Sequence, residues 1–103
     1  MSAPGVLAST PPGETITHLL LAVAADRGAM PAPRVTPGGT RVPLKPAFLR
    51  GFGDLVVTVL DGQTLVRLEG TPPPWPLSVG WERRTLRRLL GARILRPAPS
   101  SGG

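Results

Sequence analysis

The chain has 103 residues, 41% of them hydrophobic, which is enough for one small domain with a single core. It contains no cysteine, which excludes disulfides, thiolate metal sites and cysteine nucleophiles. The net charge of +6 favours an anionic partner such as nucleic acid, an acidic protein surface or anionic lipid. Lys45 is the only lysine, however, and an arginine-rich coding bias would produce the same excess.

The two ends of the chain are predicted to be disordered, on either side of a single domain at residues 14–96. Residues 1–13 are small, uncharged and interrupted by proline, and residues 97–103 read PAPSSGG. The longest apolar stretch, Leu19–Ala25, is far shorter than a membrane-spanning helix. The first residues also lack the basic start and apolar core of a secretory signal. We therefore expect no membrane span and a cytoplasmic location.

The first predicted element is a helix at residues 14–27. Thr10-Pro11 indicates its start, Glu14 suits the positive end of the helix dipole, and Gly28 is a natural C-terminal stop. Almost no polar face remains between Ile16 and Ala25. Such a helix is either buried on most sides or forms half of a dimer contact.

His18, the only histidine, lies four residues after Glu14 on the same face of this helix. A functional interpretation makes it a base held by that carboxylate. Because no nucleophile and no second metal ligand accompanies it, we interpret it as an ordinary helix residue and predict no metal site.

Residues 29–45 read as a connector with two short strands, 34–36 and 40–42, around the turn signal Pro37-Gly38-Gly39. Residues 46–51 follow as one helical turn with Pro46 at its first position. Phe48, Leu49 and Phe52 are its predicted core anchors.

A β-hairpin is predicted from Asp54 to Glu69, because two segments rich in Val, Leu and Thr flank Asp61-Gly62. That dipeptide tolerates the positive φ angles of a type I′ turn. With these two residues as the loop, one face is almost wholly apolar and is expected to seat the two helices; it comprises the pairs Val59/Thr64, Val57/Val66 and Leu55/Leu68. The other face is mixed and comprises Leu60/Gln63, Thr58/Leu65, Val56/Arg67 and Asp54/Glu69.

Residues 70–76, GTPPPWP, predict an extended polyproline segment. It is interpreted as a stiff spacer with Trp75 capping the core, and alternatively as a ligand for an aromatic groove of a partner. A second helix follows at residues 80–91, with Ser78 as a plausible N-cap and Gly91 as its stop. A short edge strand with Ile94 and Leu95 inward is expected at residues 92–96.

The second helix separates its side chains by type. Trp81, Thr85, Leu86, Leu89 and Leu90 fall on one half of the helical wheel, where only Glu82 is charged. Arg83, Arg84, Arg87 and Arg88 fall together on the other half. Guanidinium groups match phosphate oxygens bidentately, so this half predicts contact with an anionic polymer. A solvated helix face is the alternative.

The carboxylates do not predict an enzyme. Asp54 and Glu69 face each other at the open end of the hairpin, as in an acid/base dyad. Arg67 lies diagonal to Asp54 and is expected to neutralise it, which favours a structural charge cluster. With no Cys, no Tyr, one His and no phosphate-binding loop, we expect no catalysis and no cofactor.

The succession RVTPGG, TRVPLKP, AFLRGFGD and LVVTVLDGQTLVRLE begins at Arg34 and covers residues 35–69. This order of strand, turn, strand, proline, short helix, Gly-Asp and hairpin resembles the swapped-hairpin DNA-binding family of AbrB, SpoVT and MraZ. The resemblance implies a homodimer with interleaved strands that grips DNA through basic residues near the first strands. Here those positions are Arg34, Arg41, Lys45 and Arg50.

The sequence therefore predicts a small α+β domain, with an antiparallel sheet built on the hairpin at 54–69 and flanked by helices near 14–27 and 80–91. The leading functional hypothesis is a basic, non-enzymatic DNA-binding protein, dimeric and contacting phosphates through its arginines. The alternative is a structural or adaptor protein of a multi-protein, phage-like assembly. It would hold a protein partner through its helices and proline-rich segment.

Overall fold

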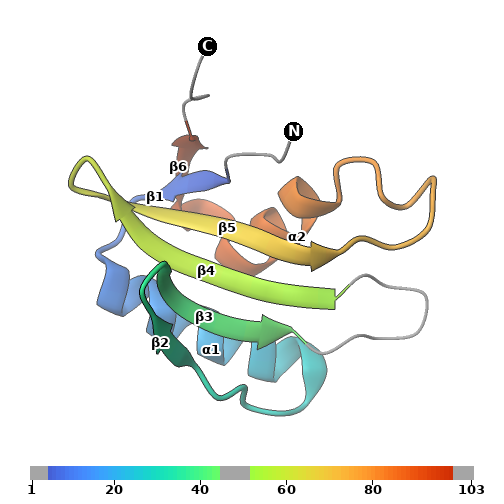
Figure 1. Ribbon diagram of the computed structural model, residues 1–103, viewed down its shortest axis with the longest axis horizontal. Helices are drawn as coiled ribbons and strands as arrows, with labels where there is room; N and C mark the ends of the chain where they lie inside the picture. Colours follow the sequence, from blue (N-terminus) through green and yellow to red (C-terminus); the bar gives the residue numbers. More distant parts are fainter. Residues whose placement is uncertain (1–4, 45–51, 99–103) are drawn as a thin grey trace.

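The computed structural model describes residues 5–44 and 52–98, and the structural statements below concern these residues. A six-stranded antiparallel sheet forms one layer and two helices form the other, which confirms the α+β prediction (Figure 1). The sheet order is β2-β3-β4-β5-β1-β6. The elements are β1 (Val6–Ala8), α1 (Pro12–Arg27), β2 (Arg34–Thr36), β3 (Gly39–Leu44), β4 (Phe52–Leu60), β5 (Gln63–Thr71), α2 (Trp81–Leu90), the 3-10 turn η1 (Gly91–Arg93) and β6 (Ile94–Pro97).

The central hairpin has the predicted turn and register. Asp61 and Gly62 have φ angles of 50° and 78°, as a type I′ turn requires. The pairing runs from Leu60 opposite Gln63 to Asp54 opposite Glu69, and it continues two residues further in each strand. The short hairpin of β2 and β3 is also confirmed, but Gly39 pairs with Thr36 instead of lying in the turn, and β3 runs from Gly39 to Leu44 where 40–42 was predicted.

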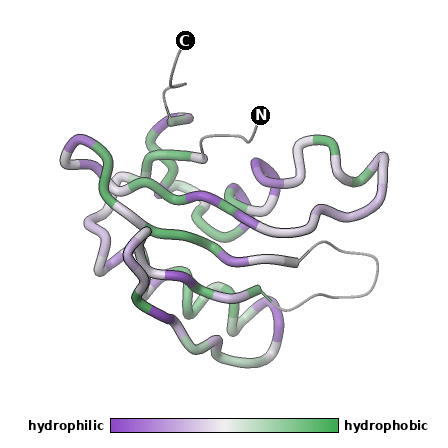
Figure 2. Tube along the Cα trace, in the orientation of Figure 1, coloured by the Kyte–Doolittle hydropathy of each residue, from purple (hydrophilic) through white to green (hydrophobic). Residues whose placement is uncertain are grey.

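One face of the sheet forms the core with both helices. Leu55 and Val57 of β4 and Val66 and Leu68 of β5 are buried there, as predicted from the apolar face of the hairpin. Val59 of the same face is 56% exposed, because it lies near the tip of the hairpin. Figure 2 shows hydrophobic stretches along β4 and α1. The helix residues that complete this core are Leu19, Val23, Leu86, Leu89 and Leu90.

Helix α1 begins at Pro12, two residues before the predicted start, and ends at Gly28 in the left-handed conformation. Its buried stripe consists of Thr15, Leu19 and Val23, spaced by one turn. Leu21, on the outer side, is 57% exposed. The helix is thus fully buried along one stripe, and Ile16, Leu20 and Ala22 beside it are partly buried against the core. Neither helix in the described parts of the chain is long and apolar enough to cross a membrane.

The prediction of disorder for residues 1–13 is wrong for the described part of that segment. Val6–Ala8 form the buried strand β1, which lies between β5 and β6. Three small or apolar residues carry no alternating pattern, so the sequence offered no strand signal here. The carbonyl oxygen of Thr10 then accepts hydrogen bonds from the hydroxyls of Thr15 and Thr64, at 3.1 and 2.7 Å, and so fixes the link from β1 to α1.

The C-terminal predictions need three corrections. Helix α2 starts at Trp81, and its N-cap is Gly80 at a φ of 68° rather than Ser78. The edge strand is Ile94–Pro97, and Leu95 points outward because strand side chains alternate between faces. Pro97, placed in the tail by composition, belongs to this strand.

Two further predictions concern Trp75 and residues 46–51. Trp75 does not cap the core; it is 80% exposed, and Trp81 packs against the core instead. The helical turn predicted at residues 46–51 lies outside the described residues. Behind the mixed face of the hairpin, Leu7, Leu65 and Ala98 form a second small buried cluster, so that face is partly covered.

Gly5, directly before β1, lies very close to the backbone of β5. Its φ is +88°, and an added Cβ would lie 2.3 Å from the carbonyl oxygen of Val66. We expect Gly5→Ala to lower the free energy of unfolding by about 1–3 kcal/mol, because backbone strain and a backbone clash combine. Gly13→Ala is the control, since nothing lies within 4 Å of an added Cβ in that helical position. Urea unfolding that found the two variants equally stable would contradict this packing of β1.

Candidate nucleic-acid interface

The four arginines predicted to share one side of the second helix do so. Arg83, Arg84, Arg87 and Arg88 are all exposed, whereas Leu86, Leu89 and Leu90 are buried against the sheet. We call these four residues the arginine face. It contains no acidic side chain, because Glu82, the only acid of α2, lies on the buried side.

Two members of the arginine face are held by neighbouring elements. The guanidinium of Arg84 donates hydrogen bonds to the carbonyl oxygens of Leu77 and Val79 in the loop before α2. Arg88 forms an ion pair with Asp26 at the end of α1, with an N–O distance of 2.5 Å. Arg83 and Arg87 make no ion pair or hydrogen bond with any described residue, so both are available to a ligand.

Glu82 attaches α2 to the sheet. Its Oε2 accepts a hydrogen bond of 3.0 Å from the backbone N–H of Leu68 in β5. Strand β1 pairs with β5 only at Thr64–Val66, so the amide of Leu68 lies beyond the end of β1 and takes this carboxylate as its partner. Burial raises the pKa of the Glu82 carboxyl, and the hydrogen bond from Leu68 and the charge of Arg67 partly offset that rise.

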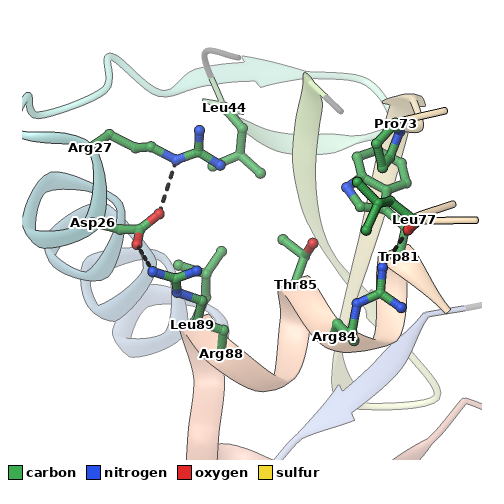
Figure 3. A pocket seen from close by; sticks show the side chains of 10 residues that line it. All are labelled: Asp26, Arg27, Leu44, Pro73, Leu77, Trp81, Arg84, Thr85, Arg88 and Leu89. Atoms are coloured by element: carbon green, nitrogen blue, oxygen red, sulfur yellow. Dashed lines mark hydrogen bonds and ion pairs between the residues drawn. The ribbon is translucent and has the colours of Figure 1, made fainter. Parts of the chain in front are cut away.

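A cavity of about 390 Å³ lies between the ends of α1 and β3, the loop before α2, and α2 itself. Figure 3 shows Asp26, Arg27 and Arg88 on one side of it, Trp81 and Arg84 on the other, and Thr85 between the two groups. Asp26 contacts both neighbouring guanidiniums, with its Oδ2 3.0 Å from Nε of Arg27. The remaining lining is apolar and consists of Leu44, Pro73, Leu77 and Leu89.

The sheet face opposite the helices carries a second charged cluster. Arg41 contacts Asp54 at 3.3 Å and Glu69 at 3.0 Å, and Arg67 contacts Glu69 at 3.0 Å. The hydrogen bond from Arg41 is the main cause that lowers the pKa of Glu69, with its charge and that of Arg67 adding to the effect. A self-neutralised cluster was predicted, but its main cation is Arg41, and Arg67 pairs with Glu69 rather than Asp54. The role of Arg41 was not predicted because the sequence did not indicate that β3 pairs with β4.

Of the four residues suggested by the family resemblance, the structure describes Arg34 and Arg41. Arg34 lies directly opposite Arg41 in the β2–β3 pair and is exposed, whereas Arg41 is engaged with two carboxylates. Lys45 and Arg50 lie outside the described residues. The arginine face of α2 is therefore the stronger candidate site.

His18 links the two helices. Its Nε2 lies 2.7 Å from the carbonyl oxygen of Leu89, so the ring donates a hydrogen bond to the last turn of α2. This is a structural contact, in line with the interpretation of His18 as an ordinary helix residue. Across residues 5–44 and 52–98, no three side chains of the types that bind metals come together.

Sequence reasoning missed the cavity residues Asp26, Arg27 and Thr85. They come from two elements that meet only in the folded chain, and no local spacing connects them. Trp81, which also lines the cavity, was assigned to the apolar half of α2, and this assignment was the one indication of the cavity in the sequence.

Comparisons with protein-family models, with curated proteins and with solved structures find no match for this chain. The resemblance to the swapped-hairpin family, and the homodimer that it implies, therefore stay predictions.

The carboxyl of Glu82 is expected to make the stability of the protein depend on pH. Because the pKa of its carboxyl is raised on folding, the native protein holds that proton more tightly than the unfolded chain does. Its ionisation therefore lowers stability as the pH rises from the unfolded pKa through the raised one. We expect Glu82→Gln, which keeps an oxygen acceptor for the Leu68 amide, to remove this loss of stability as the pH rises above the ordinary range of a glutamate carboxyl, about pH 4.

Glu82→Ala is the matched comparison for that variant. It leaves the Leu68 amide without its partner, and we expect a loss of about 1–3 kcal/mol at neutral pH, well below the stability of the Gln variant. Denaturant unfolding at several pH values measures both effects. Equal losses in the two variants would show that the hydrogen bond to Leu68 is not what matters.

Proposed function

We propose that this protein is a non-enzymatic nucleic-acid-binding protein, in the first place for DNA, and that the arginine face of α2 contacts phosphates. The observation that carries this proposal is the group of four exposed arginines on one helix side with no acid among them. The net charge of +6 adds long-range attraction for a polyanion. A cytoplasmic location and a dimer belong to the same proposal.

The two arginines without partners are the primary phosphate contacts. Arg83 and Arg87 are four residues apart and so project from the same side of α2. Each guanidinium can donate two parallel hydrogen bonds to phosphate oxygens. Contacts of this kind follow the backbone and do not read bases, so binding is expected to depend on salt more than on sequence.

The arginine face can be tested by charge reversal. We expect Arg83→Glu with Arg87→Glu to weaken DNA binding by at least about tenfold and to lower the salt slope of log K by about two. Both side chains are exposed and make no described contact, so the fold should be unaffected. Fluorescence anisotropy with a labelled oligonucleotide at about 50 to 200 mM salt measures both quantities.

Arg93→Glu with Arg96→Glu is the control, because it changes the net charge equally at two exposed positions outside α2 that the family resemblance does not implicate. It should weaken binding much less. If the two double variants weaken binding equally, charge alone drives association and the arginine face is not the site. If neither duplex nor single strand binds wild-type protein at low salt, the proposal as a whole fails.

An adaptor function is the second candidate, and one observation favours it. The loop before α2 exposes three apolar side chains, Trp75, Leu77 and Val79, close together in sequence. Exposed apolar groups of this kind are typical of protein contacts. Arg84 holds this loop through the carbonyls of Leu77 and Val79, so the loop has a defined shape to present.

Co-purification separates this candidate from nucleic-acid binding. For an adaptor, we expect Trp75→Ser with Val79→Ser to abolish capture of the protein partner. Arg83→Glu with Arg87→Glu should leave that capture intact. The opposite pattern, with nuclease treatment also releasing the partner, would reject the adaptor function.

A further inference from the structure

The cavity beside α2 is continuous with the arginine face. Arg84 and Arg88 belong to that face and also line the cavity, so its rim is cationic. A polyanion lying along α2 would therefore pass the cavity mouth. At about 390 Å³, the space falls within the range of about 300–1,000 Å³ of pockets that bind small ligands.

The lining suits a flat, mostly apolar group that carries polar edges. Trp81 and Pro73 offer flat surfaces on one side, and Leu44 and Leu89 are buried at the edge of the core. Asp26 and Thr85 add a carboxylate and a hydroxyl at the polar side (Figure 3). A nucleobase combines a stacking face with amino and carbonyl edges, and aromatic side chains beside a basic groove are a recurrent way to hold one.

We propose that this cavity receives one unpaired base of a single nucleic-acid strand whose phosphates lie along the arginine face. The inference rests on the proposed function and narrows it. Asp26 is paired with Arg27 and Arg88 and so holds Arg88 at the rim, where the phosphates lie near Arg84 and Arg88, and the hydroxyl of Thr85 faces a polar edge of the base. In a duplex the bases are paired and stacked inside, and the cavity stays without a ligand.

Strands with and without bases separate this inference from simple phosphate binding. A thymidine- or adenine-containing single strand and an abasic strand of the same length carry the same phosphates. We expect the base-bearing strand to bind about tenfold more tightly at the same salt concentration, because stacking adds to the shared electrostatic attraction. Equal affinities would overturn the inference.

Two kinds of variant test the cavity itself. Thr85→Phe fills the space between its two sides, and Leu77→Phe narrows its mouth without a change of charge, where Leu77 is 52% exposed. Each is expected to remove the advantage of the base-bearing strand while leaving abasic binding within about twofold. Two variants are used because either could disturb the fold, which thermal unfolding reports. A folded variant that kept the full advantage would overturn the inference.

Tryptophan fluorescence gives an independent readout. Trp75→Phe removes the exposed tryptophan and leaves Trp81 as the single reporter. Base-bearing strands should change the emission of Trp81, and abasic strands should not. If the emission is unchanged at saturation, no base stacks in this cavity.

The outcomes also distinguish this inference from the proposed function. If charge reversal at Arg83 and Arg87 weakens binding of all strands but bases bring no advantage, phosphate binding stands and the cavity has no such role. If no strand binds at low salt, both fail.

Discussion

The register of the β4–β5 hairpin is the constraint on which the rest of the structure depends. Because side chains alternate along a strand, a shift by one residue would turn Leu55 and Val66 away from the helices and bring Asp54 and Arg67 toward them. The turn at residues 61–62 prevents this shift, since positive φ at both positions closes the loop without splaying the strands. The turn therefore determines both which side chains of the hairpin pack against the helices and which form the charged cluster on the other face.

The same strands also orient the helix that carries the arginines. Strand β5 is longer than β1, so the backbone amide of Leu68 has no partner in β1. Glu82, in the first turn of α2, accepts a hydrogen bond from this amide. At the other end of α2, His18 binds the carbonyl of Leu89. With both ends attached and the leucines buried, the helix cannot rotate, and its cationic side faces solvent. The carboxylate of Glu82, on the buried side of α2, thus helps to keep the arginine face on the opposite side exposed.

The central part of this fold was predictable because its signals are local. A turn dipeptide between two Val- and Leu-rich segments defines the hairpin, and the spacing of leucines and arginines defines α2. Strand β1 was not predictable, because three residues without alternation become a strand only when a neighbouring edge is available. The same reason applies to the site: the arginine face lies within one helix, whereas the cavity joins Asp26 to Trp81 across more than half of the chain. Arg41 was likewise assigned to a ligand because its two carboxylate partners lie on strands that the sequence did not place beside β3.

The position of β1 has a consequence for how the chain reaches its native state. Among the strands of the described residues β1 comes first in the sequence, yet one of its two neighbours, β6, comes last. Both pairings of β1 join segments that are far apart in the sequence, and closing so long a loop costs conformational entropy that local pairs avoid. Until β1 has paired with β5, the free edge of β5 is open to other strands, including those of a second copy. Strand β1, which the sequence did not predict, is thus also the strand that completes the sheet late and protects the edge of β5.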